Sequence, residues 1–400
     1  MAVQDTSLDG PGRRFNPAAW IYDPKVRAIV FQVALIVGVI AFVAWIAGNT
    51  IENLRRANIA SGFGFFSARA GFDISQSLIE YSAEATYGRA FLVGLLNTLL
   101  VAALGIVLAS IIGFILGIAR LSKNWIVGRI ATVYVEVFRN IPVLLQLLFW
   151  YKAVLSILPG PRQGIALPGG GNLSNRGLIL PQPVFEPGFG ATFIAIVAAI
   201  VAAVVLANWA YRRRMATGQP FPTIRANIAI VVGLPLLVFL VTGAPLGVDY
   251  PELKGFNFTG GLHIQPEFLA LLLGLVLYTA AYIGEIVRSG ILAVSHGQTE
   301  ASYALGLRPG VTLRLVVIPQ AMRVIIPPLT SQYLNLTKNS SLAVAIGYPD
   351  LVSVFSGTVL NQTGQAVEVI FITMMVYLSI SLATSAFMNW FNRRVALVER

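Results

Sequence analysis

The sequence predicts an all-α polytopic membrane protein with about eight transmembrane helices, and its composition, apolar runs and basic clusters each support this fold class. Of the 400 residues, 56% are hydrophobic and 11% are charged. A typical soluble domain has about 25% charged residues, so this chain carries too few charges for a surface in water. We therefore expect most of its surface to contact lipid.

Apolar runs long enough to span a bilayer recur along the chain. A hydrocarbon layer of about 30 Å requires roughly 20 residues of helix. The expected spans are 28–48, 89–119, 126–157, 189–210, 224–243, 267–292, 321–347 and 365–390. No secretory cleavage signature precedes the first run, so we expect that run to remain as a membrane anchor.

Basic residues gather at alternate ends of these spans. Arg13 and Arg14 precede the first span, residues 212–214 are three arginines between the fourth and fifth, and Arg393 and Arg394 follow the last. Lys and Arg favour the cytoplasmic side of a membrane, so both termini are predicted to be cytoplasmic. The same clustering accounts for the net charge of +11 without nucleic acid as a partner.

The residue inventory argues against a metal or nucleotide site in this chain. It has no cysteine and two isolated histidines, His263 and His296, so neither a thiolate site nor a zinc site is expected. It has no G-x-x-x-x-G-K-[ST] phosphate loop, so we expect no bound cofactor and place ATP with its Mg²⁺ on a partner. The Gly-rich stretch 167–172 has no helix or Lys signal after it, which favours a flexible turn.

Residues 297–320 form a polar, helix-forming interruption between two apolar runs. Thr299 can cap a short helix, and Gly306 stands where a helix end often takes a left-handed residue. The apolar side of that helix is Ala301, Ala304 and Leu305. Pro309 then favours a turn. A plain connector rarely contains two ordered turns, so the pattern favours a docking element over a simple loop.

The spacing of this interruption resembles the cytoplasmic loop of membrane permease subunits of ABC importers. That loop has the form E-A-A, three residues, G, nine residues, I-x-L-P. This chain has Glu300, Ala301, Ser302, Gly306, Val316, Ile318 and Pro319 at those positions. In the family the loop forms a coupling helix in a cleft of the ATP-hydrolysing subunit. The resemblance implies ATPase coupling by Glu300, Ala301, Ser302, Ala304, Leu305, Gly306 and Pro319.

Four longer motifs resemble the polar amino acid (histidine/glutamine) branch of these permeases. They are GLLNTLLVAALG, VEVFRNIPVLLQLLFWY, AYIGEIVRSGILAVSHGQTEASYALGL and YLNLTKNSSLAVAIG. The similarity covers about 90–157 and 267–392. It implies a type I ABC importer permease core of five spans, to which this chain adds a helix pair at about 189–243. The extended form is similar to one membrane subunit of the general L-amino acid permease of Gram-negative bacteria.

The resemblance implies a simple domain organisation. Residues 1–27 are a cytoplasmic segment, 28–88 the first transmembrane helix with an external loop, 89–392 the permease domain, and 393–400 a cytoplasmic tail. Within the permease domain, about 158–266 is an insertion and 297–320 is the coupling loop. The sequence assigns no role to the insertion.

The implied function is a membrane permease subunit of an ATP-driven, binding-protein-dependent importer of L-amino acids in the bacterial inner membrane. The implied partners are a periplasmic amino acid binding protein, a cytoplasmic ABC ATPase dimer, a second permease subunit and membrane lipid. The insertion favours a related heteromeric partner, and a homodimer stays open. We expect the binding protein to contact loop 49–88 and the segment 348–363.

Two other classes of protein compete with this interpretation. A secondary, ion-coupled amino acid transporter would use intramembrane glutamates as proton or sodium sites and would contain inverted repeats. The only hint of a repeat is that Tyr134 and Tyr282 shortly precede Glu136 and Glu285. A membrane enzyme would use one of these glutamates as an acid or base, but no paired His, metal cluster or activated Ser accompanies them.

Polar side chains inside the expected spans are candidates for a substrate pathway, because a charge in the apolar interior is costly and usually faces a cavity or partner. Glu136 and Arg139 lie three residues apart, as do Glu285 and Arg288, so each pair can bond on one helix face. The full candidate set is Glu136, Arg139, Gln146, Glu285, Arg288, Gln332, Asn335 and Lys338. The pairs either stabilise helix packing or line a passage for a zwitterion, whose two charges need opposite partners.

Three prolines, Pro142, Pro327 and Pro328, fall inside the expected spans. Each removes a backbone donor and favours a kink or a broken helix. Such kinks are either hinges for transport or static adjustments to packing.

Overall fold

The computed structural model describes residues 24–56 and 61–395. Predictions for 1–23, 57–60 and 396–400, including the placement of Arg13 and Arg14, lie outside these ranges. Among the described residues, seven helices are long and apolar enough to cross a membrane, or eight if one bent pair is counted as a span. The predicted number of spans and the all-α membrane core are therefore confirmed.

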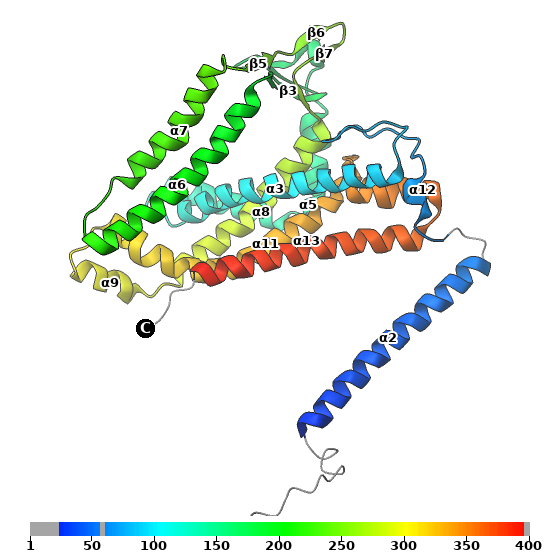
Figure 1. Ribbon diagram of the computed structural model, residues 1–400, viewed down its shortest axis with the longest axis horizontal. Helices are drawn as coiled ribbons and strands as arrows, with labels where there is room; N and C mark the ends of the chain where they lie inside the picture. The colour runs from blue at the N-terminus through cyan, green and yellow to red at the C-terminus, as the bar shows by residue number, and fades with distance from the viewer. Residues whose placement is uncertain (1–23, 57–60, 396–400) are drawn as a thin grey trace, which may run out of the picture.

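Most of the expected spans correspond to single long helices. These are α2 (Pro24–Arg56), α3 (Tyr87–Ala119), α6 (Phe189–Thr217), α7 (Thr223–Val241), α8 (Pro266–Leu292), α11 (Ile318–Asn339) and α13 (Ala366–Val395). Helix α2 lies apart from the other helices (Figure 1), and its whole apolar window is exposed. The short helices η1 (Gly64–Ser67) and η3 (Pro161–Gln163) lie in the connections.

The expected span at 126–157 is not one continuous helix, because the chain bends sharply there. Helix α4 (Trp125–Asn140) is followed by α5 (Val143–Leu148) and a π-helix, η2 (Phe149–Leu155), and the two parts are bent by 105°. Pro142 stands at the break, as its missing backbone donor predicts. The side-chain amide of Gln146 donates to the carbonyls of Phe138 and Ile141, at 2.9 Å each, and so satisfies acceptors that the break exposes.

The core lies where α8 packs between α3 and α11. A Cβ added at Gly113 would lie 2.5 Å from Cβ of Ile283, and one at Gly117 would lie 2.6 Å from Cβ of Val287. Only glycine therefore allows α3 to approach α8 this closely, as small residues do at helix contacts in membranes. On the α11 side, Ile325 is buried against the same core.

Helix α11 contains Pro327 and Pro328 without interruption, so of the two predicted alternatives, a kink or a broken helix, the break does not occur at these positions. A proline inside a membrane helix is tolerated where neighbouring groups satisfy the freed backbone acceptors. The chain then continues through the 3₁₀-helix η5 (Ser340–Ile346), the π-helix η6 (Val352–Val359) and α12 (Leu360–Thr363) to α13.

The insertion forms strands as well as helices, which the sequence did not predict. Strands β1 (Ile165–Leu167), β2 (Gly171–Ser174), β3 (Gly177–Leu180) and β8 (Leu262–Ile264) form one antiparallel sheet in that order. Two further ribbons pair β4 (Gln182–Phe185) with β5 (Leu246–Asp249) and β6 (Glu252–Lys254) with β7 (Asn257–Thr259). The Gly-rich stretch is the turn between β1 and β2, with Gly169 and Gly170 at positive φ.

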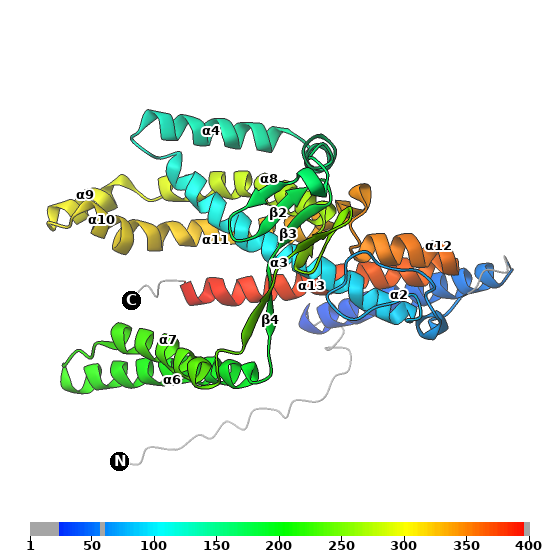
Figure 2. The ribbon, with the colours of Figure 1, turned by 90° about the horizontal axis from the view of Figure 1, so that it is seen from above.

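The added helix pair stands beside the bundle. Helices α6 and α7 run alongside each other, away from α8 and α11, and the β4–β5 ribbon joins them to the sheet (Figures 1 and 2). Small residues of α6, among them Ala195, Ala199 and Ala203, are buried. The remaining faces of the pair are apolar and exposed, as in helices surrounded by lipid.

Candidate functional sites

The loop at 297–320 contains α9 (His296–Ala304), α10 (Pro309–Thr312) and the π-helix η4 (Leu313–Val317). Gly306 has a φ of +76°, which confirms its predicted left-handed conformation at the end of α9. The predicted cap at Thr299 is wrong, because α9 begins three residues earlier and Ser295 occupies the cap position. A contact of 3.0 Å between Nδ1 of His296 and Oε1 of Glu300 joins positions i and i+4 in the first turns. Pro309 is the first residue of α10, a position that suits its fixed φ.

Helix α9 presents an apolar end to the solvent. Leu305 is 81% exposed and Tyr303 is 48% exposed, and Glu300, Ala301 and Ala304 are also exposed. Ser302 is the buried member of the predicted set and donates to the carbonyl of Gln298 at 2.7 Å. Gln298 in turn accepts a side-chain hydrogen bond of 3.2 Å from Gln320, which links α9 to α11. The loop is therefore an ordered element in which the side chain of Leu305 is exposed.

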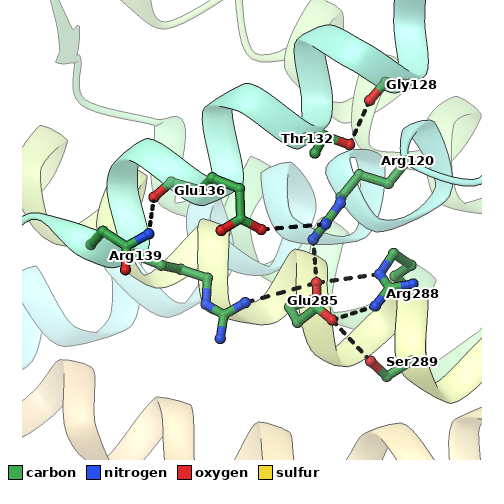
Figure 3. A network of polar contacts seen from close by, with 9 residues as sticks. Arg120, Gly128, Thr132, Glu136, Arg139, Glu285, Arg288 and Ser289 are labelled. Atoms are coloured by element: carbon green, nitrogen blue, oxygen red, sulfur yellow. Dashed lines mark hydrogen bonds and ion pairs between the residues drawn. The ribbon is translucent and has the colours of Figure 1, made fainter. Parts of the chain in front are cut away.

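Five charged residues form a second site, which we call the arginine–glutamate cluster. They are Arg120 after α3, Glu136 and Arg139 on α4, and Glu285 and Arg288 on α8 (Figure 3). The Glu285 carboxylate lies at the centre: it accepts hydrogen bonds from Arg120 and from Arg288, the latter at 2.6 Å. Arg139 approaches the same carboxylate at 3.8 Å, and Ser289 donates to it at 3.2 Å. Three positive and two negative charges thus hold three helices together.

The pairing within this cluster differs from the prediction. The bond between Glu285 and Arg288 is confirmed, but Glu136 pairs with Arg120, at 3.6 Å, instead of with Arg139. Arg139 bends toward α8, where its guanidinium lies 5.3 Å from the ring of Tyr282. Arg120, whose side chain is only 9% exposed, is not among the predicted residues, because it follows an apolar span instead of lying inside one. Its position directly after α3 is the one signal that could have found it.

The other predicted pathway residues lie elsewhere. Gln146 is buried and bonds to the backbone at the α4–α5 break, so its amide nitrogen is occupied. Gln332, Asn335 and Lys338 lie on α11, where Asn335 and Lys338 are exposed and Gln332 is half-buried. Exposed polar groups in a membrane-spanning helix face a cavity or a partner. The structure therefore separates the eight candidates into the cluster, a structural amide and a polar face of α11.

A buried polar turn, at 347–351, was not predicted as a site. Asp350 is fully buried, and its carboxylate accepts from the backbone of Ser353 at 2.8 Å and from the hydroxyl of Tyr377 at 3.3 Å. Burial raises the pKa of Asp350 to about 7. Asn97 on α3 donates to the carbonyls of Pro349 and Gln76, at 2.9 Å each. This turn therefore ties α3, α13 and the loop before α3 to one another.

Comparison with known proteins gives a family and several relatives. Residues 191–397 match the model of the family described as binding-protein-dependent transport system inner membrane component. The general L-amino acid transport system permease protein AapQ of Rhizobium johnstonii is 58% identical over 100% of this chain and 99% of its own length. The putative amino-acid ABC transporter permease protein YhdX of Escherichia coli is 55% identical over 94% and 96%. The glutamate/glutamine/aspartate/asparagine transport system permease protein BztB of Rhodobacter capsulatus is 43% identical over 98% and 99%.

Proposed function

Because this chain belongs to the family of binding-protein-dependent transport system inner membrane components, we propose that it is the permease subunit of an ATP-driven importer that carries L-amino acids across the bacterial inner membrane. The amino acid substrate is supported by three relatives that match nearly the whole chain and are each named as amino acid permeases. The observation that carries the mechanism is the exposed apolar end of α9.

The α9 segment docks on a cytoplasmic ATPase in this proposal. Leu305 is almost fully exposed at the end of an ordered helix, so a partner surface that buries it gains about 2 kcal/mol from the hydrophobic effect. ATP with its Mg²⁺ is then bound and hydrolysed by an ATPase dimer, since this sequence has no phosphate loop. The coupling set is Glu300, Ala301, Ser302, Ala304, Leu305, Gly306 and Pro319.

Motion of α9 reaches the membrane helices by a short route. Only the three residues 293–295 separate α9 from the end of α8. Glu285 and Arg288 lie in the last turns of α8, and the carboxylate of Glu285 pairs with Arg120, Arg139 and Arg288. Displacement of α9 therefore pulls on a cluster that joins α8 to α3 and α4.

The substrate passage lies between this chain and a second permease subunit. The polar face of α11, which includes Asn335 and Lys338, is exposed in the single chain, and a partner subunit would remove it from lipid. A periplasmic amino acid binding protein delivers the substrate on the side where α8 begins, opposite α9. Both termini are then cytoplasmic, with α9 on the same side.

Copurification with a matched pair of variants tests the coupling proposal. The chain is purified from its native membrane in mild detergent, together with Leu305→Asp and the control Leu78→Asp, which changes an exposed leucine far from α9. We expect an ATPase with wild type and the control, and its loss with Leu305→Asp, because an aspartate cannot enter an apolar contact without a large desolvation cost. Mass spectrometry identifies the copurified proteins.

The alternative outcomes of this experiment point to different conclusions. An ATPase retained by Leu305→Asp would show that α9 does not provide the contact. No ATPase with any of the three proteins would favour a secondary, ion-coupled transporter. A second permease in the wild-type sample would identify the heteromeric partner, and its absence would favour a homodimer.

A further inference from the structure

A polar cavity lies where the insertion meets the membrane helices. Its volume is about 530 Å³, and nine of its twelve lining residues come from the insertion at 158–266. The wall is completed by Tyr151 within η2, Ser156 just after η2, and Glu267 in the first turn of α8. Because α8 begins at this cavity and ends next to α9, the cavity is on the opposite side of the membrane from α9.

Two opposite charges share this cavity without bonding to each other. Arg176 lies in the turn between β2 and β3, and Glu267 lies on α8. No ion pair within 4 Å joins them among the described residues. One oxygen of Glu267 accepts a hydrogen bond of 2.8 Å from the hydroxyl of Tyr151, which fixes the carboxylate. A cation and an anion that line one polar cavity without pairing leave each charge able to bind the opposite charge of a zwitterion.

The turn that carries Arg176 is held against the wall of the cavity. Gly177, the next residue, has a φ of +104°, which only glycine adopts readily. A Cβ at this position would lie 2.2 Å from the carbonyl oxygen of Ile264, so the turn lies directly on the end of β8. The side-chain amide of Gln265, the residue after β8, donates a hydrogen bond of 2.5 Å to the carbonyl of Ser75 in the loop before α3. The turn that carries Arg176 is therefore packed directly against the strand that leads into α8.

We propose that this cavity binds the zwitterionic head of an α-amino acid before the substrate enters the membrane passage. The Arg176 guanidinium binds the carboxylate of the ligand, and Glu267 accepts hydrogen bonds from its ammonium group. The carboxamides of Asn175 and Asn257 lie in the same wall and offer neutral hydrogen bonds to the side chain of the ligand. The insertion then serves as the frame of a substrate vestibule. This inference rests on the proposed amino acid substrate.

Direct binding to the intact importer tests the vestibule. The chain is purified with its copurifying subunits, in lipid nanodiscs and without binding protein, and is titrated with a uniformly ¹⁴C-labelled mixture of L-amino acids. We compare wild type with Arg176→Gln, Glu267→Gln and the control Lys254→Gln, which removes a cation on the neighbouring β6–β7 ribbon. We expect about tenfold weaker binding with the first two variants and no change with the control, because a charge-assisted hydrogen bond is lost.

Competition and uptake give independent measurements. Butyrate, which has the carboxylate alone, and butylamine, which has the ammonium alone, should each compete poorly with the labelled amino acids. In proteoliposomes with binding protein and ATP, the two variants should raise KM for uptake with little change in kcat. Arg176→Lys keeps the positive charge and should retain part of the binding, which guards against a variant that merely misfolds.

The outcomes separate this inference from the function on which it rests. If wild-type proteoliposomes take up no amino acid, the proposed substrate is wrong. If wild type takes up amino acids but both charge variants bind and transport like Lys254→Gln, the vestibule proposal is overturned. Equal competition by butyrate or butylamine would also overturn it, because a zwitterion site requires both charges.

Discussion

The contact between α3 and α8 and the contact between α6 and α7 are both helix pairs in apolar segments, yet they are packed very differently. Of the apolar 18-residue segment of α8, 61% is buried, whereas only 6% of the corresponding segment of α7 is buried. Both helices are long enough and apolar enough to cross a membrane. Apolar composition therefore predicts that a helix spans the bilayer, but it does not predict whether protein or lipid surrounds it.

Glycine explains much of this difference. Gly113 and Gly117 on α3 stand directly opposite Ile283 and Val287 on α8, with no room for a side chain. On α7, a Cβ added at Gly233 meets no atom within 4 Å. The core pair thus depends on the absence of a side chain at two positions, while the inserted pair does not.

The largest expected effect on stability comes from adding a side chain at Gly117, where α8 leaves no room for one. In Gly117→Val, the new side chain would meet Cβ of Val287 at 2.6 Å and the carbonyl oxygen of Gly284 at 2.8 Å, so α3 must move away from α8. We expect a loss of about 3 kcal/mol in the free energy of unfolding, or failure to accumulate in the membrane. Thermal unfolding in detergent and membrane yield measure both.

The matched control on the inserted pair is Gly233→Val. Because that position faces open space, we expect a change within about 0.5 kcal/mol. If the two variants destabilise the protein equally, the distinction between a packed core and a lipid-facing pair is wrong.

An intermediate effect is expected at the arginine–glutamate cluster. Arg120→Gln removes the cation that bonds to both Glu136 and Glu285 and whose side chain is 9% exposed. We expect a loss of about 2 kcal/mol, below the value for a fully buried pair because both glutamates retain some contact with solvent. Arg212→Gln, at the exposed end of α6, should leave stability unchanged. Equal melting curves for wild type and Arg120→Gln would contradict a packing role of the cluster.

The smallest expected effect is a change in pH dependence at Asp350. Its pKa rises from 3.8 to about 7 on folding because of burial, so the folded state holds an extra proton between these values. The stabilisation that the raised pKa of Asp350 contributes is fully present below pH 3.8, and it is lost as the pH rises through about 7. Asp350→Asn has no such proton, so its melting temperature should vary less with pH over this range. Asp249→Asn, an exposed change in the insertion, should follow the wild-type profile.

Features that depend on neighbouring residues were predicted correctly from the sequence. The left-handed conformation at Gly306, the break at Pro142 and the bond between Glu285 and Arg288 each depend on a few neighbouring residues. Features that depend on a residue distant in the sequence were not predicted. Glu136 bonds to Arg120 across a helix junction instead of to Arg139 on its own helix. Local pattern cannot reveal which side chain a folded neighbour will present.

The sequence by itself determined that this protein is a polytopic membrane protein whose loop around Gly306 resembles that of ABC importer permeases, because apolar length, basic clusters and motif spacing are properties of continuous segments. Tertiary structure alone decided which helices form the core, since α8 is largely buried although it is less apolar than the exposed α7. It also decided how the charges combine. Glu285 gathers three arginines from three helices, and Arg176 and Glu267, 91 positions apart, line one cavity only because the insertion folds back onto α8.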